Sequence, residues 1–181
     1  LELYEFFTSH EGLILDYEQA LTKYDALDKK YYDHSGHMIW VGDRTRSVNG
    51  SHVEFVSGIE NPIGIKLGPS IDKHELIEII KKVNPNNEKG KILLITRFGA
   101  QSIEDKLPEI IKLINKRELN VIWMCDPMHG NTFINDQGIK TRHFNTITKE
   151  IELFMKIHKK MKSIAGGIHI EFTSENVTEC L

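Results

Sequence analysis

The hydrophobic and polar positions of the chain form two kinds of segment. Short apolar runs occupy residues 38–41, 63–67, 92–95, 121–124 and 168–172. Most of these runs are apolar at successive positions, which is typical of parallel strands buried on both faces. We therefore predict five strands at these places, and a sixth at residues 3–7.

Segments with helical periodicity lie between the later strands. Residues 72–83, 103–114 and 147–161 each carry apolar side chains at intervals of three and four, so each forms one apolar stripe. Each segment is long enough to cross back over a sheet. The order of strand, helix and strand predicts right-handed βαβ units and a parallel α/β fold.

Two parallel architectures are compatible with this order, an open doubly wound sheet and a (β/α)8 barrel. No Gly-x-Gly-x-x-Gly motif follows a strand, so the dinucleotide-binding form of the open sheet is not supported. Polar residues stand at the carboxyl end of strand after strand, where barrel enzymes place catalytic groups. A barrel takes about 250 residues. The 181 residues begin at Leu1 and have room for about six strands, so we expect one domain, residues 1–181, that is part of a longer barrel.

Composition excludes several classes of protein. Hydrophobic residues make up 40% and charged residues 27% of the chain, which excludes a disordered chain and an integral membrane protein. The net charge of -3 gives no basic surface for nucleic acid. Cys125 and Cys180 lack CxxC spacing, which excludes a disulfide scaffold and an all-cysteine zinc site and favours a reducing compartment.

Three cations follow or end consecutive predicted strands. Arg44, Lys66 and Arg97 should reach the same rim of a parallel sheet, each with a glycine nearby. Cations that converge in this way suit an anionic ligand, and the guanidinium group of arginine matches phosphate or carboxylate. Each could instead be a surface cation at a strand end. Lys66 has another possible role, as the Schiff-base lysine of an aldolase.

The later strand ends carry a histidine and a carboxylate. His129 follows the strand at 121–124, and alternation along the last strand turns Glu171 toward the inside of a barrel. A buried carboxylate must be paired or bound to a metal, so His129 and Glu171 could form half of a divalent-metal site. The alternatives are a structural histidine and a glutamate paired with an arginine. Cys125 could be a further ligand, although a strand cysteine is more often part of the core.

Several blocks of sequence closely resemble the type II (plant-like) 3-deoxy-D-arabino-heptulosonate 7-phosphate (DAHP) synthases. The resemblance covers essentially the whole chain, in order. The blocks that carry it are Ser9-His10-Glu11, Trp40-Val41-Gly42-Asp43-Arg44-Thr45-Arg46, Gly64-Ile65-Lys66-Leu67-Gly68-Pro69, Arg97-Phe98-Gly99, Cys125-Asp126-Pro127-Met128-His129-Gly130-Asn131-Thr132, Lys140-Thr141-Arg142, His169-Ile170-Glu171 and Glu175-Asn176-Val177-Thr178-Glu179-Cys180.

The resemblance implies a (β/α)8 barrel, with this chain covering about strands 3 to 8. It also implies condensation of phosphoenolpyruvate with D-erythrose 4-phosphate, the first step of the shikimate route to chorismate and the aromatic amino acids. Lys66, Arg97 and His129 would be catalytic, and His129 and Glu171 would bind a divalent metal, Mn2+ or Co2+. The positions matching the family's phosphoenolpyruvate site are Asp43, Arg44, Lys66 and Arg97, and those facing its substrate pocket are Trp40, Lys140 and Arg142.

This chain also departs from the family pattern. The family usually has Glu where this chain has Asp43, and two further metal ligands, a Cys and an Asp, have no counterpart here. Besides the metal-dependent transferase, we consider a phosphate-metabolite binding fragment without catalysis and a Schiff-base aldolase that uses Lys66. We expect a homo-oligomer without nucleic-acid or membrane partners, in the cytoplasm or, for a plant source, in the plastid.

Overall fold

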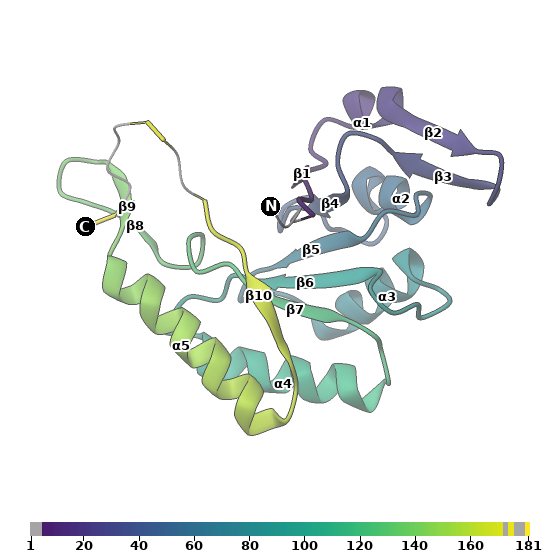
Figure 1. Cartoon of the computed structure of the whole chain (residues 1–181). Helices are drawn as coiled ribbons and strands as arrows, with labels where there is room; N and C mark the ends of the chain where they lie inside the picture. The colour runs from purple at the N-terminus through teal and green to yellow at the C-terminus, as the bar shows by residue number, and fades with distance from the viewer. Residues whose placement is uncertain (1–4, 172–173, 176–179) are drawn as a thin grey trace. The chain divides into compact units, whose positions relative to one another are not determined.

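The computed structural model describes residues 5–171, 174–175 and 180–181 (Figure 1). Its contacts divide the chain into two compact units. The first unit comprises Leu1–Lys66 and His74–Leu93, and the second comprises Leu67–Lys73 and Leu94–Leu181.

The first unit is built on three adjacent strands, β1 (Ser9–Glu11), β4 (Met38–Val41) and β5 (Ile63–Leu67). They are parallel, with His10 opposite Ile39 and Ile39 opposite Ile63. Around them lie α1 (Leu15–Leu21), α2 (Ser51–Ser57) and α3 (Lys73–Val83), with an antiparallel hairpin of β2 (Thr22–Asp25) and β3 (Lys30–Asp33). The core is aliphatic, because every residue of β5 is buried and α3 buries five apolar side chains.

The second unit holds β6 (Ile92–Thr96), β7 (Ile122–Cys125) and β10 (Ala165–Ile168), in the order β6-β7-β10. Helices α4 (Ile103–Lys116) and α5 (Phe144–Met161) pack side by side against these strands (Figure 1). A short hairpin of β8 (Thr132–Ile134) and β9 (Lys140–Arg142) precedes α5. Cys180 and Leu181 return to β9, where the Leu181 amide donates to the Arg142 carbonyl at 2.7 Å.

The predicted α/β fold is confirmed, since each unit contains parallel strand pairs and the described residues also form five helices. The strands at 38–41 and 63–67 are confirmed to the residue, and those at 92–95 and 121–124 to within one residue. The three predicted helices are confirmed as α3, α4 and α5, with the predicted apolar stripes facing the core. The barrel and the single domain stay predictions.

Two strand predictions were wrong in position. Residues 5–7 are not in a strand, and the first strand of the described residues starts at Ser9; Leu3 and Tyr4 of the predicted strand lie outside the described residues. The last strand is Ala165–Ile168 rather than 168–172, and Phe172 lies outside the described residues. Two glycines hide this strand from a search for apolar runs. Gly166 is required there, because a Cβ on it would lie 2.7 Å from the Trp123 carbonyl oxygen of β7, whereas a Cβ on Gly167 would make only an ordinary contact with the Met124 side chain.

Both hairpins and the short helices α1 and α2 were not predicted, because they carry little apolar periodicity. Within the described ranges, no helix has the length and apolar character needed to cross a bilayer.

Candidate functional site

In the first unit, Lys66 and Trp40 meet on neighbouring strands. Lys66 lies on β5 and is 6% exposed, and its Nζ lies 5.7 Å from the centroid of the Trp40 ring on β4. A tryptophan face attracts an ammonium ion at this distance. The contact holds Lys66 in a defined place near the carboxyl end of β5.

The turn after β4 is held by an ion-pair cluster. The buried Arg46 guanidinium donates from Nε to Asp43 at 3.0 Å and from Nη1 to Glu75 of α3 at 3.1 Å. Arg44, the predicted ligand residue, is exposed. Sequence reasoning overlooked the structural part played by Arg46, although the close pair of arginines, Arg44 and Arg46, was a signal that one of them could serve the fold.

In the second unit, the turn after β7 presents His129. Asp126 is fully buried, and its Oδ1 accepts the backbone N–H groups of Met128 and His129 at 3.0 and 3.2 Å. Its Oδ2 lies 2.7 Å from His129 Nδ1, which orients the imidazole. The other ring nitrogen, Nε2, lies 3.3 Å from Glu171 Oε1. Asp126 therefore directs Nε2 toward Glu171, as carboxylates do behind metal-binding histidines.

Arg97 contacts the same turn. It follows β6, and its Nη2 donates to the His129 carbonyl at 2.9 Å. Arg97 and the predicted pair His129 and Glu171 thus lie together in the second unit.

The residues of the β9 strand behave differently from one another. Arg142 is 5% exposed, and its Nε donates to the Met128 carbonyl at 2.5 Å, which braces the His129 turn. Lys140 is exposed. The roles assigned to both residues in substrate binding stay predictions.

A buried carboxylate that sequence reasoning missed joins the loops after β6 and β7. Glu150 of α5 is fully buried; its Oε1 accepts the Gly99 N–H at 2.9 Å and its Oε2 accepts from Asn131 Nδ2 at 2.6 Å. Burial raises the pKa of Glu150 to about 7, although the Gly99 and Asn131 hydrogen bonds act in the opposite direction. Its position on the apolar stripe between Ile147 and Ile151 was the signal that could have revealed it.

The metal prediction passes a test of donor chemistry and fails in one detail. His129 Nε2 and Glu171 Oε1 are a nitrogen and an oxygen donor that face each other, and two ligands about 2.1 Å from one ion lie roughly 3 Å apart. Glu171 is not buried as predicted: its side chain is 57% exposed and lies beyond β10, because the strand ends at Ile168. Among the described residues, no group of three or more His, Cys, Asp or Glu side chains could hold a metal ion. Cys125 is buried in β7, as expected of a core residue.

The three predicted anion-binding cations are divided between the units. Arg44 and Lys66 belong to the first unit and Arg97 to the second. Their convergence on one ligand stays a prediction.

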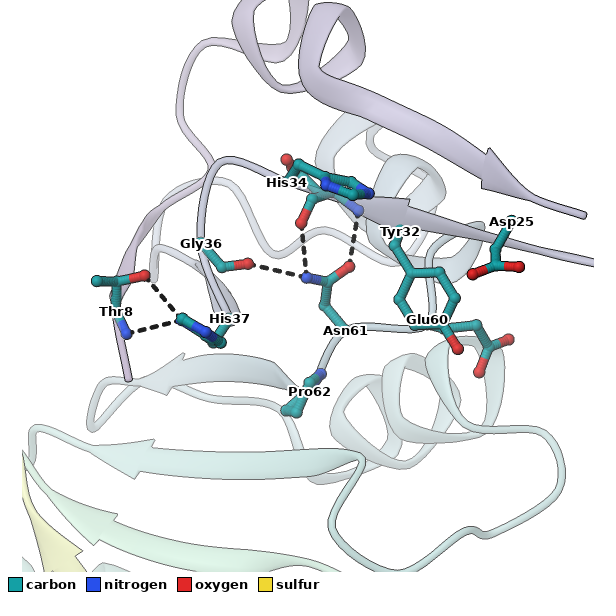
Figure 2. A pocket seen from close by; sticks show the side chains of 10 residues that line it. Thr8, Asp25, Tyr32, His34, Gly36, His37, Glu60, Asn61 and Pro62 are labelled. Atoms are coloured by element: carbon teal, nitrogen blue, oxygen red, sulfur yellow. Dashed lines mark hydrogen bonds between the residues drawn. The ribbon is translucent and has the colours of Figure 1, made fainter. Parts of the chain in front are cut away.

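The first unit also contains a cavity of about 500 Å³ at the opposite ends of its strands (Figure 2). It is lined by residues that precede β1, β4 and β5, such as Thr8, His37 and Asn61, and by residues of the β2-β3 hairpin. Figure 2 shows these polar groups bonded to one another: the Asn61 amide donates to the Asp33 and Gly36 carbonyls, and His37 Nδ1 lies 3.0 Å from the Thr8 nitrogen. The amino ends of parallel strands usually serve stability. We therefore assign no ligand to this cavity.

These features define a parallel α/β protein with candidate functional groups where its strands end. The model of the Class-II DAHP synthetase family matches residues 1–181, and the chain belongs to this family.

The curated relatives carry the corresponding enzyme name. A phospho-2-dehydro-3-deoxyheptonate aldolase of Streptomyces coelicolor is 48% identical over 177 residues, which cover 98% of this chain and 39% of the relative. Proteins of that name from Mycolicibacterium smegmatis and Neurospora crassa are each 45% identical over the whole chain and 40% and 41% of their own lengths. The chain thus spans about two fifths of these relatives.

Proposed function

We propose that the complete protein containing this chain is a DAHP synthase, which condenses phosphoenolpyruvate with D-erythrose 4-phosphate and releases phosphate. The observation that carries the proposal is the placement of Arg97, His129 and Glu171 around one turn, in a chain that belongs to this family throughout its length. We propose the barrel architecture, with this chain as about strands 3 to 8, on the same ground.

In this mechanism the cations hold phosphoenolpyruvate. Arg44, Lys66 and Arg97 would neutralise its phosphate and carboxylate, with Asp43 beside them, and orient its C3 toward the aldehyde carbon of erythrose 4-phosphate. A bond forms between these two carbons, water adds at C2, and phosphate leaves from C2. The Lys66 Nζ lies 5.7 Å from the centroid of the Trp40 ring, a geometry in which the ring face attracts a cation, and this contact supports phosphate binding by Lys66 over Schiff-base chemistry.

His129 and Glu171 would hold the divalent cation, Mn2+ or Co2+, which supplies Lewis-acid polarisation of the aldehyde when bound. Asp126 would keep the proton of His129 on Nδ1, so that the lone pair of Nε2 stays available to bind the metal. We further propose that Trp40, Lys140 and Arg142 face the substrate pocket, and that the protein is a cytoplasmic or plastid homo-oligomer.

The test is consumption of phosphoenolpyruvate, followed by its absorbance, in the presence of erythrose 4-phosphate. With the complete gene product, we expect activity to be lost in EDTA and restored by Mn2+. His129→Ala and Glu171→Ala should lower kcat/KM by about 100-fold or more, whereas the exposed His34→Ala should leave it unchanged.

Activity that is indifferent to EDTA would contradict the metal site. Borohydride trapping of Lys66 with substrate would then support the Schiff-base aldolase. Binding of phosphoenolpyruvate without any turnover would support the non-catalytic binding fragment.

A further inference from the structure

We propose that Glu150 is a positioning residue, whose carboxylate fixes the loop that carries Arg97 relative to the turn that carries His129. The inference rests on the proposed function for its catalytic consequence. Its structural part stands on contacts within the second unit alone.

Glu150 connects backbone and side-chain groups from two different loops. Oε1 accepts the Gly99 amide after β6, while Oε2 accepts the Asn131 amide after β7. Asn131 extends the network in both directions, since its Oδ1 accepts the Ala100 N–H at 2.9 Å and its Nδ2 donates to the Pro127 carbonyl at 2.8 Å. One carboxylate on α5 thus ties together loops that are about 30 residues apart in the chain.

The two loops are also in direct contact. Gly99 has a φ of +81°, and a Cβ on it would lie 2.5 Å from the Gly130 carbonyl oxygen. Arg97 lies two residues before Gly99, and His129 lies one residue before Gly130. The Arg97 side chain donates to the His129 carbonyl, so the two loops are also joined beside this contact. Any shift of one loop past the other therefore displaces Arg97 relative to His129.

Stability alone is a poor reason for this arrangement. A buried carboxylate costs free energy even when it is hydrogen-bonded, and apolar replacements of buried polar networks are often neutral or stabilising. What an apolar side chain cannot supply is two acceptors aimed at two loops. Orientation of this kind matters in catalysis, where a displacement of about 1 Å can lower a rate by roughly 100-fold.

Glu150→Gln is the variant that tests the network. If the glutamine accepts from the Gly99 N–H, its own N–H2 group faces the Asn131 N–H2 group, and two donors meet. Flipping the glutamine amide places its N–H2 against the Gly99 N–H instead. Flipping the Asn131 amide places its N–H2 against the Ala100 N–H. We expect kcat/KM for phosphoenolpyruvate to fall by about 10- to 100-fold.

Two controls separate positioning from general damage. Glu152→Gln makes the same charge change on the exposed face of α5 and should leave kcat/KM within about twofold. Phe154→Leu, in the fully buried core of the same helix, should lower the melting temperature with kcat/KM within about threefold. If Glu150→Gln and Phe154→Leu, at equal folded fraction, lower kcat/KM alike, Glu150 is only structural and the proposal fails.

A rescue variant gives the sharper test. Asn131→Asp alone places two carboxylates together and should be more harmful than Glu150→Gln. In the double variant, the glutamine introduced at position 150 can accept from Gly99 and donate to the aspartate introduced at position 131, which still accepts from Ala100. The double variant should therefore regain at least about tenfold in kcat/KM over Asn131→Asp. No recovery would overturn the proposal.

Hydrogen exchange of the wild-type protein keeps the inference testable if a variant does not fold. The Gly99 and Ala100 amides should exchange far more slowly than loop amides without such partners, and rapid exchange would refute the network. If the wild-type protein shows no turnover, the proposed function fails. Slow amide exchange, and a coupling between Glu150 and Asn131 in the free energy of unfolding, would still decide whether the two loops are tied together.

Discussion

Each unit buries a glutamate from a helix, and the two glutamates differ in what they hold. Glu18 of α1, 1% exposed, lies 2.9 Å from His10 Nε2 and accepts from Ser35 Oγ at 2.6 Å, so both of its partners are side chains. Glu150 of α5 accepts from a backbone amide and from Asn131, which is itself bonded to backbone. A side-chain network can rearrange by rotamer changes, whereas backbone partners fix the path of the chain. The comparison indicates that the second unit specifies loop positions more strictly.

The largest effect is expected where the two loops of the second unit touch. In Gly130→Ala, the new Cβ would lie 2.9 Å from the Arg97 carbonyl and still closer to the Gly99 nitrogen. Backbone atoms cannot move aside as side chains can, so we expect a loss of about 4 kcal/mol in the free energy of unfolding. Denaturant unfolding measures it.

Gly90→Ala is the matched change in the first unit. Gly90 also has a positive φ, +83°, but nothing lies within 4 Å of its Cβ position. Only the left-handed conformation is penalised there, by about 1 kcal/mol. Equal losses in the two variants would contradict the stricter packing of the second unit.

The strand-end turns show how far sequence reasoning reaches. Apolar runs identified β4 and β5 to the residue because their side chains are apolar at successive positions, apart from Gly64 and Lys66 of β5, and both faces of β5 are buried. The stripes of α3 to α5 were equally clear. His129 and Glu171 were paired from their places along the chain, and their side chains do meet.

The missed features depend on contacts that no periodicity encodes. The strand β10 is half glycine, and its backbone passes close to β7 at Gly166. Glu150 is one of many charged residues in a helix, and only its place on the apolar stripe distinguishes it. Asp126 directly follows a strand, yet its role behind His129 needs the folded turn.

The next prediction concerns the pH dependence of stability, to which two buried groups of α5, Glu150 and His158, contribute in opposite directions. Burial raises the pKa of Glu150 from 4.5 to about 7, so its folded form binds a proton more tightly than its unfolded form and its contribution to stability falls as pH rises between these values. Burial lowers the pKa of His158 from 6.5 to about 4, so its contribution is lost as pH falls from 6.5 to 4. The two slopes oppose each other in wild-type protein.

Single variants should expose each slope. Relative to wild type, His158→Leu should show stability that declines by on the order of 2–3 kcal/mol as pH rises from 4.5 to 7, and Glu150→Gln should show the opposite trend. The measurement is the free energy of unfolding at several pH values, taken as the difference from wild type. Differences that do not vary with pH would show that neither group titrates abnormally in the folded unit. They would also contradict the expectation that the neighbouring charge of Asp126 helps to raise the pKa of Glu150.

The smallest effect belongs to the ion-pair cluster of the first unit. Asp43→Asn removes the charge that faces Arg46 Nε, but Arg46 keeps its contact with Glu75 at 3.1 Å, and Asp43 is only partly buried. Because a second carboxylate remains, we expect a loss of about 1 kcal/mol or less in the free energy of unfolding. A double-mutant cycle with Glu75→Gln measures the coupling, which should shrink in high salt. A loss as large as that of Gly130→Ala would mean that the first unit fixes its strand-end turn as strictly as the second does, through side chains alone.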